Sequence, residues 1–294
     1  MTLCRRILLL SVCFVAACGT GEKEPAAPTV TLPPECNGSA ALCAKRFNEV
    51  TFLTTHNAMS NADDPWVAPN QNHPIRRQLA DGVRGISLDM HENTQSPADV
   101  LTCHSSCAIG SRLLQFQLQD IRDFLAANTD TVVSILYESA GVSDAQVAHV
   151  VNVSGLTPYV YTQATDATWP TLGDMVRRNR RLVLFSQDGA GVPGVILPMW
   201  KYTWDNPYAA KSTSDFSCAV GRGDARNTIM QINHFITAPV AGEYWAKQAN
   251  TYASLQEHVA RCHAQWHKWP TFLWVDWYAT GDALQYVMDL DARE

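Results

Sequence analysis

Two histidines in this sequence follow short apolar runs, and together they have the chemistry of a proton-transfer pair. His56 follows residues 51–55, and His104 follows residues 100–103. Imidazole is the side chain that titrates near neutral pH without assistance, so one ring can accept a proton while another donates one. Further polar side chains end or follow other apolar runs: Asn57, Asp89, His91, Glu138, Asn233, His234 and Asp276. Each alone is explained equally well as a strand cap or a solvent-facing group, so their accumulation is what indicates a site.

Seven runs are short, rich in β-branched or aromatic residues and bounded by turn residues, which is typical of strands. They comprise residues 51–55, 82–90, 100–103, 131–138, 181–186, 228–233 and 271–278. Amphipathic stretches between them predict helices within residues 73–82, 111–129, 143–155, 171–179 and 251–266. An eighth strand is expected either in the weak run PYVYT near Tyr159 or in a segment that the pattern does not locate.

Repeated alternation of strands and helices predicts an α/β fold with parallel strands. We expect a single domain that forms a TIM-type β/α barrel, either closed or distorted and incomplete. In such a barrel the carboxyl ends of all strands open onto one face, so the polar side chains above should meet at one mouth. The first and last strands would be neighbours, which would bring Asp276 close to His56.

The composition limits the function classes. The chain has 294 residues, of which 46% are hydrophobic, so it can bury a sizeable core. Its formal net charge is -6 and its pI is about 5.8. A nucleic-acid-binding surface requires clustered lysine and arginine, so no nucleic acid partner is expected.

The first residues are typical of a targeting signal. Arg5 and Arg6 precede an apolar stretch that is too short to span a bilayer, and residues 15–18 end in Cys18. This pattern resembles a lipoprotein-type signal peptide with a lipobox, at residues 1–18, with an ordinary cleaved signal as the alternative. A Pro/Ala/Thr-rich linker follows at residues 19–35. We therefore expect an exported protein, anchored to a membrane surface through Cys18 as a bacterial lipoprotein in the periplasm or at the cell surface.

Six of the nine cysteines lie beyond the signal, an even number that suits disulfides in an oxidising compartment. Six cysteines allow 15 pairings. Cys36 with Cys43 and Cys103 with Cys107 are close enough to close small loops, which leaves Cys218 with Cys262. Zinc ligation is the competing interpretation, although the spacings match no four-ligand zinc pattern.

Four motifs, in order, resemble the X domain of phosphatidylinositol-specific phospholipase C: TTHNAMS, GVRGISLDMHEN, LTCHSSC and VVSILYES. The later stretches DATWPTLGDMVRRNRRLVLFS and KWPTFLWVDWY, with the helix that carries Cys262, resemble the second half of that barrel in plant and bacterial X-domain-containing proteins. The resemblance implies a PLC-like phosphodiesterase X-domain barrel at residues 36–294. It also implies a phosphoric diester hydrolase of the phospholipase C type, acting on a phospholipid or another phosphodiester.

By this resemblance His56 would be the general base and His104 the general acid. A carboxylate is expected to fix the tautomer of the base and to stabilise its imidazolium, and Asp276 is placed to do so. The same family binds calcium through residues that fall here on Asn57, Asp89 and Glu138. Oxygen ligands of this kind suit Ca²⁺ or a similar divalent cation.

Two departures from the family pattern concern the charge of the phosphate. The calcium-dependent pattern has a glutamate where this chain has Ser87, and the calcium-independent bacterial pattern has an arginine where this chain has His91. We favour a divalent cation, with Glu92 or water completing its ligands, and we expect His91 and Asn233 to contact the substrate. Head-group selection cannot be assigned from Gln187 or Lys201.

Three alternatives stay open from the sequence. The substrate of a related barrel could be a glycerophosphodiester or a sphingolipid. The missing charge near Asp89 favours an anchored binding module that has lost turnover. A zinc-dependent hydrolase would use His91, His104 and His234 with the carboxylates, although no strand carries the His-x-His pair usual in such sites.

Overall fold

The computed structural model describes residues 33–237 and 242–293. Its helices are α1 (Ile75–Asp81), α2 (Leu114–Ala127), α3 (Asp144–Val153), α4 (Leu172–Arg177), α5 (Glu243–Ala249), α6 (Tyr252–Trp266) and α7 (Ala283–Asp291). Its strands are β1 (Phe52–Thr55), β2 (Gly85–Glu92), β3 (Val100–Thr102), β4 (Arg112–Leu113), β5 (Val133–Ala140), β6 (Leu182–Ser186), β7 (Leu197–Pro198), β8 (Thr203–Asp205), β9 (Arg222–Gly223), β10 (Ile229–Asn233) and β11 (Phe272–Val275). Short 3-10 helices are η1 (Ala41–Ala44), η2 (Phe47–Glu49), η3 (Cys107–Ile109), η4 (Thr157–Tyr159), η5 (Met199–Lys201) and η6 (Thr213–Asp215).

The strands form one curled sheet in the order β7-β6-β5-β2-β1-β11-β10-β8-β9. Neighbours along this path are parallel except for β9, which is antiparallel to β8. The first predicted strand lies beside the last, because β1 pairs with β11. In the described chain the path ends at β7 and β9 without joining them, so the barrel is open. This arrangement confirms a TIM-type barrel in its incomplete form, within a single domain.

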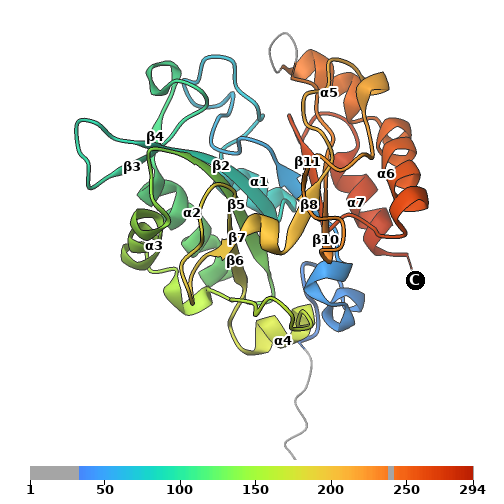
Figure 1. The fold of residues 1–294 in the computed structure, drawn as a ribbon, viewed down its shortest axis with the longest axis horizontal. Helices are drawn as coiled ribbons and strands as arrows, with labels where there is room; N and C mark the ends of the chain where they lie inside the picture. Colours follow the sequence, from blue (N-terminus) through green and yellow to red (C-terminus); the bar gives the residue numbers. More distant parts are fainter. Residues whose placement is uncertain (1–32, 238–241, 294) are drawn as a thin grey trace, which may run out of the picture. The chain divides into compact units, whose positions relative to one another are not determined.

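Helices cover the outer face of the sheet, and the two ends of the barrel differ. Figure 1 shows α2 and α3 flanking one side of the sheet and α6 and α7 flanking the other. The hairpin of β3 and β4 lies at the same end as α5, whereas α4 lies at the opposite end. The first of these ends is where the parallel strands finish and where the polar side chains gather.

Alternation along each strand sorts the side chains into two cores. Phe52, Leu136, Phe185, Phe272 and Trp274 belong to one cluster inside the curl of the sheet. Their sequence neighbours, such as Leu53, Ile135 and Leu273, pack in a second cluster that includes the residues of the covering helices. Counting two residues onward from the inner positions predicts that Asp89, Glu138 and Asp276 face the mouth of the barrel.

One close approach explains the glycine that begins β2. Gly85 pairs with Thr54 on β1, and a Cβ atom at Gly85 would lie 2.2 Å from the Thr54 hydroxyl oxygen. Only a residue without a side chain fits there. The contact holds β1 and β2 close together just before His56 and Asn57, which follow β1.

Some predictions about the elements were wrong. Residues 100–102 form β3, which is antiparallel to β2 and not a barrel strand. The PYVYT run is a 3-10 helix at Thr157–Tyr159, followed by a single bridge from Val160 to Leu182. The strands β4, β7, β8 and β9 were not predicted, because strands of two or three residues carry no readable period, and residues 112–113 were assigned to a helix. The helices α5 and α7 were also not predicted.

Three disulfides join Cys36 to Cys43, Cys103 to Cys107, and Cys218 to Cys262, as the spacing indicated. In the described residues no helix combines the length and the apolar character needed to cross a bilayer. The signal peptide, the lipobox with Cys18 and the linker up to Leu32 lie outside the described residues.

Candidate active site

The side chains of His56 and Asp276 meet at the ends of β1 and β11. The Nδ1 atom of His56 lies 2.9 Å from Oδ1 of Asp276. A carboxylate only accepts hydrogen bonds, so Nδ1 carries the proton and Nε2 holds a lone pair. The Nδ2 atom of Asn57 donates to that Nε2 atom over 3.2 Å. This tautomer leaves Nε2 of His56 able to take a proton from a bound hydroxyl group.

The loop that follows β1 ties His56 and Asp276 together. The Nε2 atom of Gln71 donates to the backbone oxygens of both His56 and Val275, at 2.6 Å and 3.1 Å. The Nδ2 atom of Asn70 donates to the same carboxylate oxygen, Oδ1 of Asp276, over 3.3 Å. The His56 ring also stacks on Phe235 with centroids 4.1 Å apart. The ring of His56 is therefore held from three sides.

Asp89 and Glu138 are side by side on neighbouring strands. They are register partners across the parallel pair of β2 and β5, so their side chains leave the same face of the sheet. The Asp89 carboxylate lies 2.9 Å from Nε2 of His91. Burial raises the pKa of Asp89, while His91, the Ser105 amide and His56 act in the opposite direction. The His91 side chain therefore contacts the Asp89 carboxylate directly.

His104 lies in the loop between β3 and η3, which the disulfide of Cys103 and Cys107 closes. Burial lowers the pKa of His104, and the nearby positive charge of His56 lowers it further. Asp276 and Glu138 act in the opposite direction. The Cys103 amide donates to the Asp89 carbonyl over 3.1 Å, so the loop that carries His104 lies beside the end of β2, although His104 itself does not line the cavity.

A cavity of about 290 Å³ opens beside His56. It is lined by His56, Ser87, Tyr137, Glu138, Gln187, Met199, Tyr208, Arg222, Asn233, Phe235 and Trp274. These residues come from nine strands or the segments that follow them, so the cavity is the mouth of the barrel. The lining combines polar groups with aromatic rings, and its size suits a small hydroxylated or charged group.

One wall of the cavity is built around the guanidinium of Arg222. Its Nε atom donates to Oδ2 of Asp205 over 3.0 Å, and its NH1 group donates to Gln187 over 3.0 Å. The rings of Trp200 and Tyr208 cover its two faces, each with its centroid 4.8 Å away. We call Asp205, Tyr208 and Arg222 the Arg222 wall.

The wall is continuous with the candidate ligands. The Nε2 atom of Gln187 donates to Glu138 over 3.1 Å. On the other side, Nδ2 of Asn233 donates to Oδ2 of Asp205 over 3.1 Å. One hydrogen-bonded network thus runs from Glu138 across the Arg222 wall to Asn233.

The structure brings together most of the predicted site residues. His56, Glu138 and Asn233 line the cavity, while Asp276 contacts Nδ1 of His56 and Asn57 contacts its Nε2 atom. Asp89, His91 and His104 form the neighbouring charged group. The sequence did not indicate Asp205, Tyr208 or Arg222, because the short strands β8 and β9 that carry this wall were not predicted. The only signal was the acidic residue that ends the run Thr203–Asp205.

His234 does not join this group. Its Nδ1 atom lies 2.9 Å from Nδ1 of His258, and its Nε2 atom donates to the Ala249 carbonyl over 2.8 Å. Both imidazoles are buried. Both nitrogens of His234 are therefore occupied away from the cavity, which removes this residue from the ligand set that a zinc hydrolase would need.

Comparison with known proteins decides the family. The model for the PI-PLC X domain family, described as PI-PLC X 1, matches residues 42–291. The chain belongs to the PI-PLC X domain family. It is 27% identical over 303 residues to an uncharacterized secreted protein of Arthroderma benhamiae, covering 92% of this chain and 66% of that protein. It is 26% identical over 324 residues to a PI-PLC X domain-containing protein of Arabidopsis thaliana, covering 94% of this chain and 74% of that protein.

Solved structures show the same fold. The phosphatidylinositol-specific phospholipase C from Listeria monocytogenes has a TM-score of 0.58 at 16% identity, covering 85% of this chain and 97% of that chain. The F249X mutant of the Staphylococcus aureus enzyme has a TM-score of 0.57 at 12% identity, covering 86% and 95%. The PI-PLC X domain chain therefore has a PLC-like phosphodiesterase fold. Its disulfides and its secreted relative suggest an exported protein.

Proposed function

We propose that this PI-PLC X domain protein is a phosphoric diester hydrolase of the phospholipase C type, with His56 as general base and His104 as general acid. The observation that carries the proposal is the contact between Nδ1 of His56 and Asp276, which leaves the lone pair of this cavity-lining ring on Nε2. Positioned proton transfers of this kind contribute about 10² to 10⁴ in rate.

Each proton has a donor and an acceptor in this scheme. A hydroxyl of the head group attacks phosphorus and loses its proton to Nε2 of His56 as the new O–P bond forms. The bond between phosphorus and the lipid oxygen breaks, and that oxygen takes a proton from His104. For an inositol lipid the products are a cyclic phosphodiester and diacylglycerol. Water then opens the ring with the two imidazoles in reversed roles.

The network between Glu138 and Asn233 supports a polyhydroxylated head group. Carboxylates, amides and a guanidinium offer paired donors and acceptors, and Tyr208 and Trp274 offer aromatic faces to the apolar side of a ring. In this proposal Asn233 contacts the head group directly. His91 contributes near the phosphate, next to Asp89.

Calcium, or a similar divalent cation, is the proposed cofactor. The donor set fits a hard cation, because Asp89 and Glu138 are register partners and Asn57 adds an amide at the same mouth. A bound cation would stabilise the negative charge of the reacting phosphate. Chelation should then lower activity, and added calcium should restore it. Unchanged activity after exhaustive chelation would remove the cation from the scheme.

A lipid surface is the proposed setting of the reaction. The phospholipid substrate that the fold suggests has its phosphodiester at such a surface. Val67 and Ile109 are exposed apolar residues on two loops joined by a hydrogen bond from the Val67 amide to the Ile109 carbonyl. Tyr244 on α5 is also exposed, and α5 and the β3–β4 hairpin lie at one end of the barrel (Figure 1). A lipid anchor on Cys18 would hold the protein at the same surface.

The decisive experiment is a phosphodiesterase assay with matched substrates. The purified mature protein is incubated with phosphatidylinositol, glycerophosphoinositol and sphingomyelin in detergent micelles, with calcium or chelator. We expect a cyclic inositol phosphate from phosphatidylinositol, lost in His56→Ala and His104→Ala. A hydrolysis product from another diester, equally sensitive to both substitutions, would keep the reaction class and change the substrate.

A binding module without turnover is the second candidate. The position of Ser87 favours it, because this residue lines the cavity where a third carboxylate would have supplied a cation ligand. Its signature is saturable binding of phosphatidylinositol micelles with no product from any of the three lipids. Such a result would overturn the hydrolase proposal and keep the cavity as a head-group site.

A further inference from the structure

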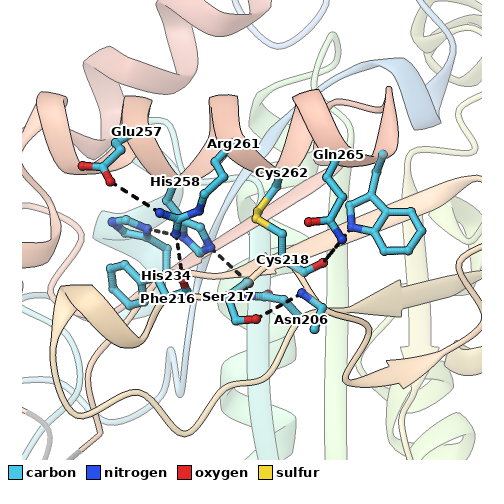
Figure 2. The surroundings of a disulfide bond; sticks show 12 residues. Asn206, Phe216, Ser217, Cys218, His234, Glu257, His258, Arg261, Cys262 and Gln265 are labelled. Atoms are coloured by element: carbon cyan, nitrogen blue, oxygen red, sulfur yellow. Dashed lines mark hydrogen bonds and ion pairs between the residues drawn. A yellow bond between two sulfur atoms is a disulfide. The ribbon is translucent and has the colours of Figure 1, made fainter.

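A disulfide outside the cavity anchors the segment that leads into the Arg222 wall. Cys218 is bonded to Cys262 on α6, and the Cys218 carbonyl accepts a hydrogen bond from Nε1 of Trp266 over 2.7 Å. Figure 2 shows this disulfide beneath α6, with Ser217 beside it and Asn206 below. Arg261 adds a bond of 2.7 Å to the Phe216 carbonyl. Residues 216–218 are therefore fixed to α6 at several points.

The Ser217 carbonyl connects this anchored segment to the barrel through a hydrogen bond. The Nδ2 atom of Asn206 donates to it over 2.9 Å. From the other side Nε2 of His258 lies 3.3 Å from the same oxygen (Figure 2). Asn206 is 2% exposed and directly follows β8. Its side chain therefore links the end of β8 to the segment of residues 216–218 that is fixed to α6.

Asn206 also fixes one residue of the cavity, Asn233, at two points. Its Oδ1 atom accepts from the backbone amide of Asn233 over 2.6 Å, and its carbonyl accepts from Nδ2 of Asn233 over 2.6 Å. Asn233 in turn donates to Asp205, and Asp205 holds Arg222. The chain of contacts is thus unbroken from the disulfide to the guanidinium in the cavity.

We propose that Asn206 and the Cys218–Cys262 disulfide form a brace that positions the Arg222 wall and so sets the affinity for the head group. This inference rests on the proposed function of the same cavity. Asn206 is a positioning residue, because it acts through Asn233 and Asp205 and does not line the cavity.

The brace should affect binding more than the chemical step. Its chain of hydrogen bonds leads to Asn233, Asp205 and Arg222, of which Asn233 and Arg222 line the cavity. The hydrogen bonds that hold His56 come from other residues, namely Asp276 after β11 and Gln71 in the loop after β1. Loosening the brace would let the wall move while the proton-transfer residues keep their places. An effect on uniform substrate binding raises KM and leaves kcat unchanged.

Steady-state kinetics on phosphatidylinositol micelles test this division. We expect Asn206→Ala, and separately Cys218→Ser with Cys262→Ser, to raise KM about tenfold, which corresponds to about 1.4 kcal/mol. The value of kcat should stay within about twofold. Removing the Cys36–Cys43 disulfide is the matched control, since it takes away a disulfide far from the wall in sequence, and it should leave KM unchanged.

The combined variant tests whether the two parts act as one unit. If they share one chain of contacts, the variant lacking Asn206 and the disulfide should show the KM of either alone and not the product of both effects. Multiplicative effects, an equal rise of KM in the Cys36–Cys43 control, or a loss in kcat alone would overturn the brace.

Hydrogen exchange separates failure of the brace from failure of the proposed function. In the full mature chain, Cys218→Ser with Cys262→Ser should speed amide exchange in residues 203–223 and at the Asn233 amide, whether or not any lipid is cleaved. Exchange that speeds up only at residues 216–218 and in α6 would refute the brace. Absence of lipid cleavage by the wild type, with exchange as expected, would refute only the enzymatic role.

Discussion

Asp276 contacts the Nδ1 atom of His56 and not its Nε2 atom, and this choice determines what the imidazole can do. A ring that donates from Nδ1 to a buried carboxylate presents its lone pair on the opposite side. The same carboxylate stabilises the imidazolium that forms when Nε2 takes a proton. The contact therefore sets the tautomer of His56.

Replacing Asp276 with asparagine should disturb the tautomer while the shape of the site is kept. The amide can donate to Nδ1, which would move the proton of His56 to Nε2 and block its role as a base. We expect kcat to fall by about 10² to 10⁴. Asp289→Asn, an acid on α7 that contacts Tyr252, is the control and should retain full activity. Wild-type kcat in Asp276→Asn would mean that His56 is not the base.

His104 should limit the reaction at higher pH. A general acid must be protonated, and burial together with His56 lowers the pKa of His104 below the ordinary histidine value of 6.5. Activity should therefore fall as the pH rises, and this fall should begin below pH 6.5. The measurement is the pH dependence of kcat/KM between pH 4 and 8.

The role of His104 can be separated from its structural surroundings with an activated substrate. His104→Ala should reduce cleavage of phosphatidylinositol by about 10² to 10⁴. A nitrophenyl phosphodiester carries a leaving group that departs without a proton, so its cleavage should be affected far less. An equal loss on both substrates would assign His104 to the fold of the β3–η3 loop.

Arg222 and Arg226 offer a matched comparison. Both form ion pairs with an aspartate, but Arg222 lines the cavity and Arg226 has a side chain that is 91% exposed. Arg222→Gln should raise KM by about tenfold or more, because its hydrogen bonds to Asp205 and Gln187 are lost. Arg226→Gln should leave KM unchanged, since exposed ion pairs contribute little. Similar KM values for both variants would remove Arg222 from the head-group wall.

Stability should decrease on acidification because of the buried imidazoles of His234 and His258. Burial lowers the pKa of His234 to about 4 and that of His258 to about 3. The unfolded chain binds protons at these side chains near pH 6.5, so their contribution to stability is present above that pH and is lost as the pH falls toward 4. The free energy of unfolding should have a positive slope against pH in this window.

A variant isolates this contribution. In His258→Gln the slope between pH 6.5 and 4 should decrease by up to one proton, or about 1.4 kcal/mol per pH unit. Denaturant titrations at pH 6.5, 5.5 and 4.5 measure it. His149→Gln, a change of the same kind on α3, should preserve the wild-type slope. An unaltered slope in His258→Gln would show that this imidazole is not the proton-linked group.

The predictable part of the site lies on the strands with readable patterns. Barrel closure alone places the last strand beside the first, and the structure confirms this neighbourhood with Asp276 at hydrogen-bond distance from His56. Asp89 and Glu138 follow from two long central strands whose ends lie in register. In these cases the local pattern and the global topology determine the same position.

The other part depends on tertiary contacts that leave no local pattern. Residues 100–102 are apolar enough for a barrel strand, but their direction is set by antiparallel pairing with β2. Arg222 reaches the cavity through a strand of two residues that exists only as a partner of β8. The pairing of Arg222 with Asp205, 17 residues away, could not be read from composition or period.

The proposed proton-transfer site and the proposed head-group wall occupy different parts of the open sheet. The histidines and the proposed cation ligands stand on the continuous middle of the sheet, whereas the Arg222 wall stands next to the terminal strand β9. A terminal strand has a partner on one side only, so insertions and substitutions there disturb no second neighbour. Substitutions in β9 should therefore change the proposed head-group contacts while leaving the proposed proton-transfer residues in place.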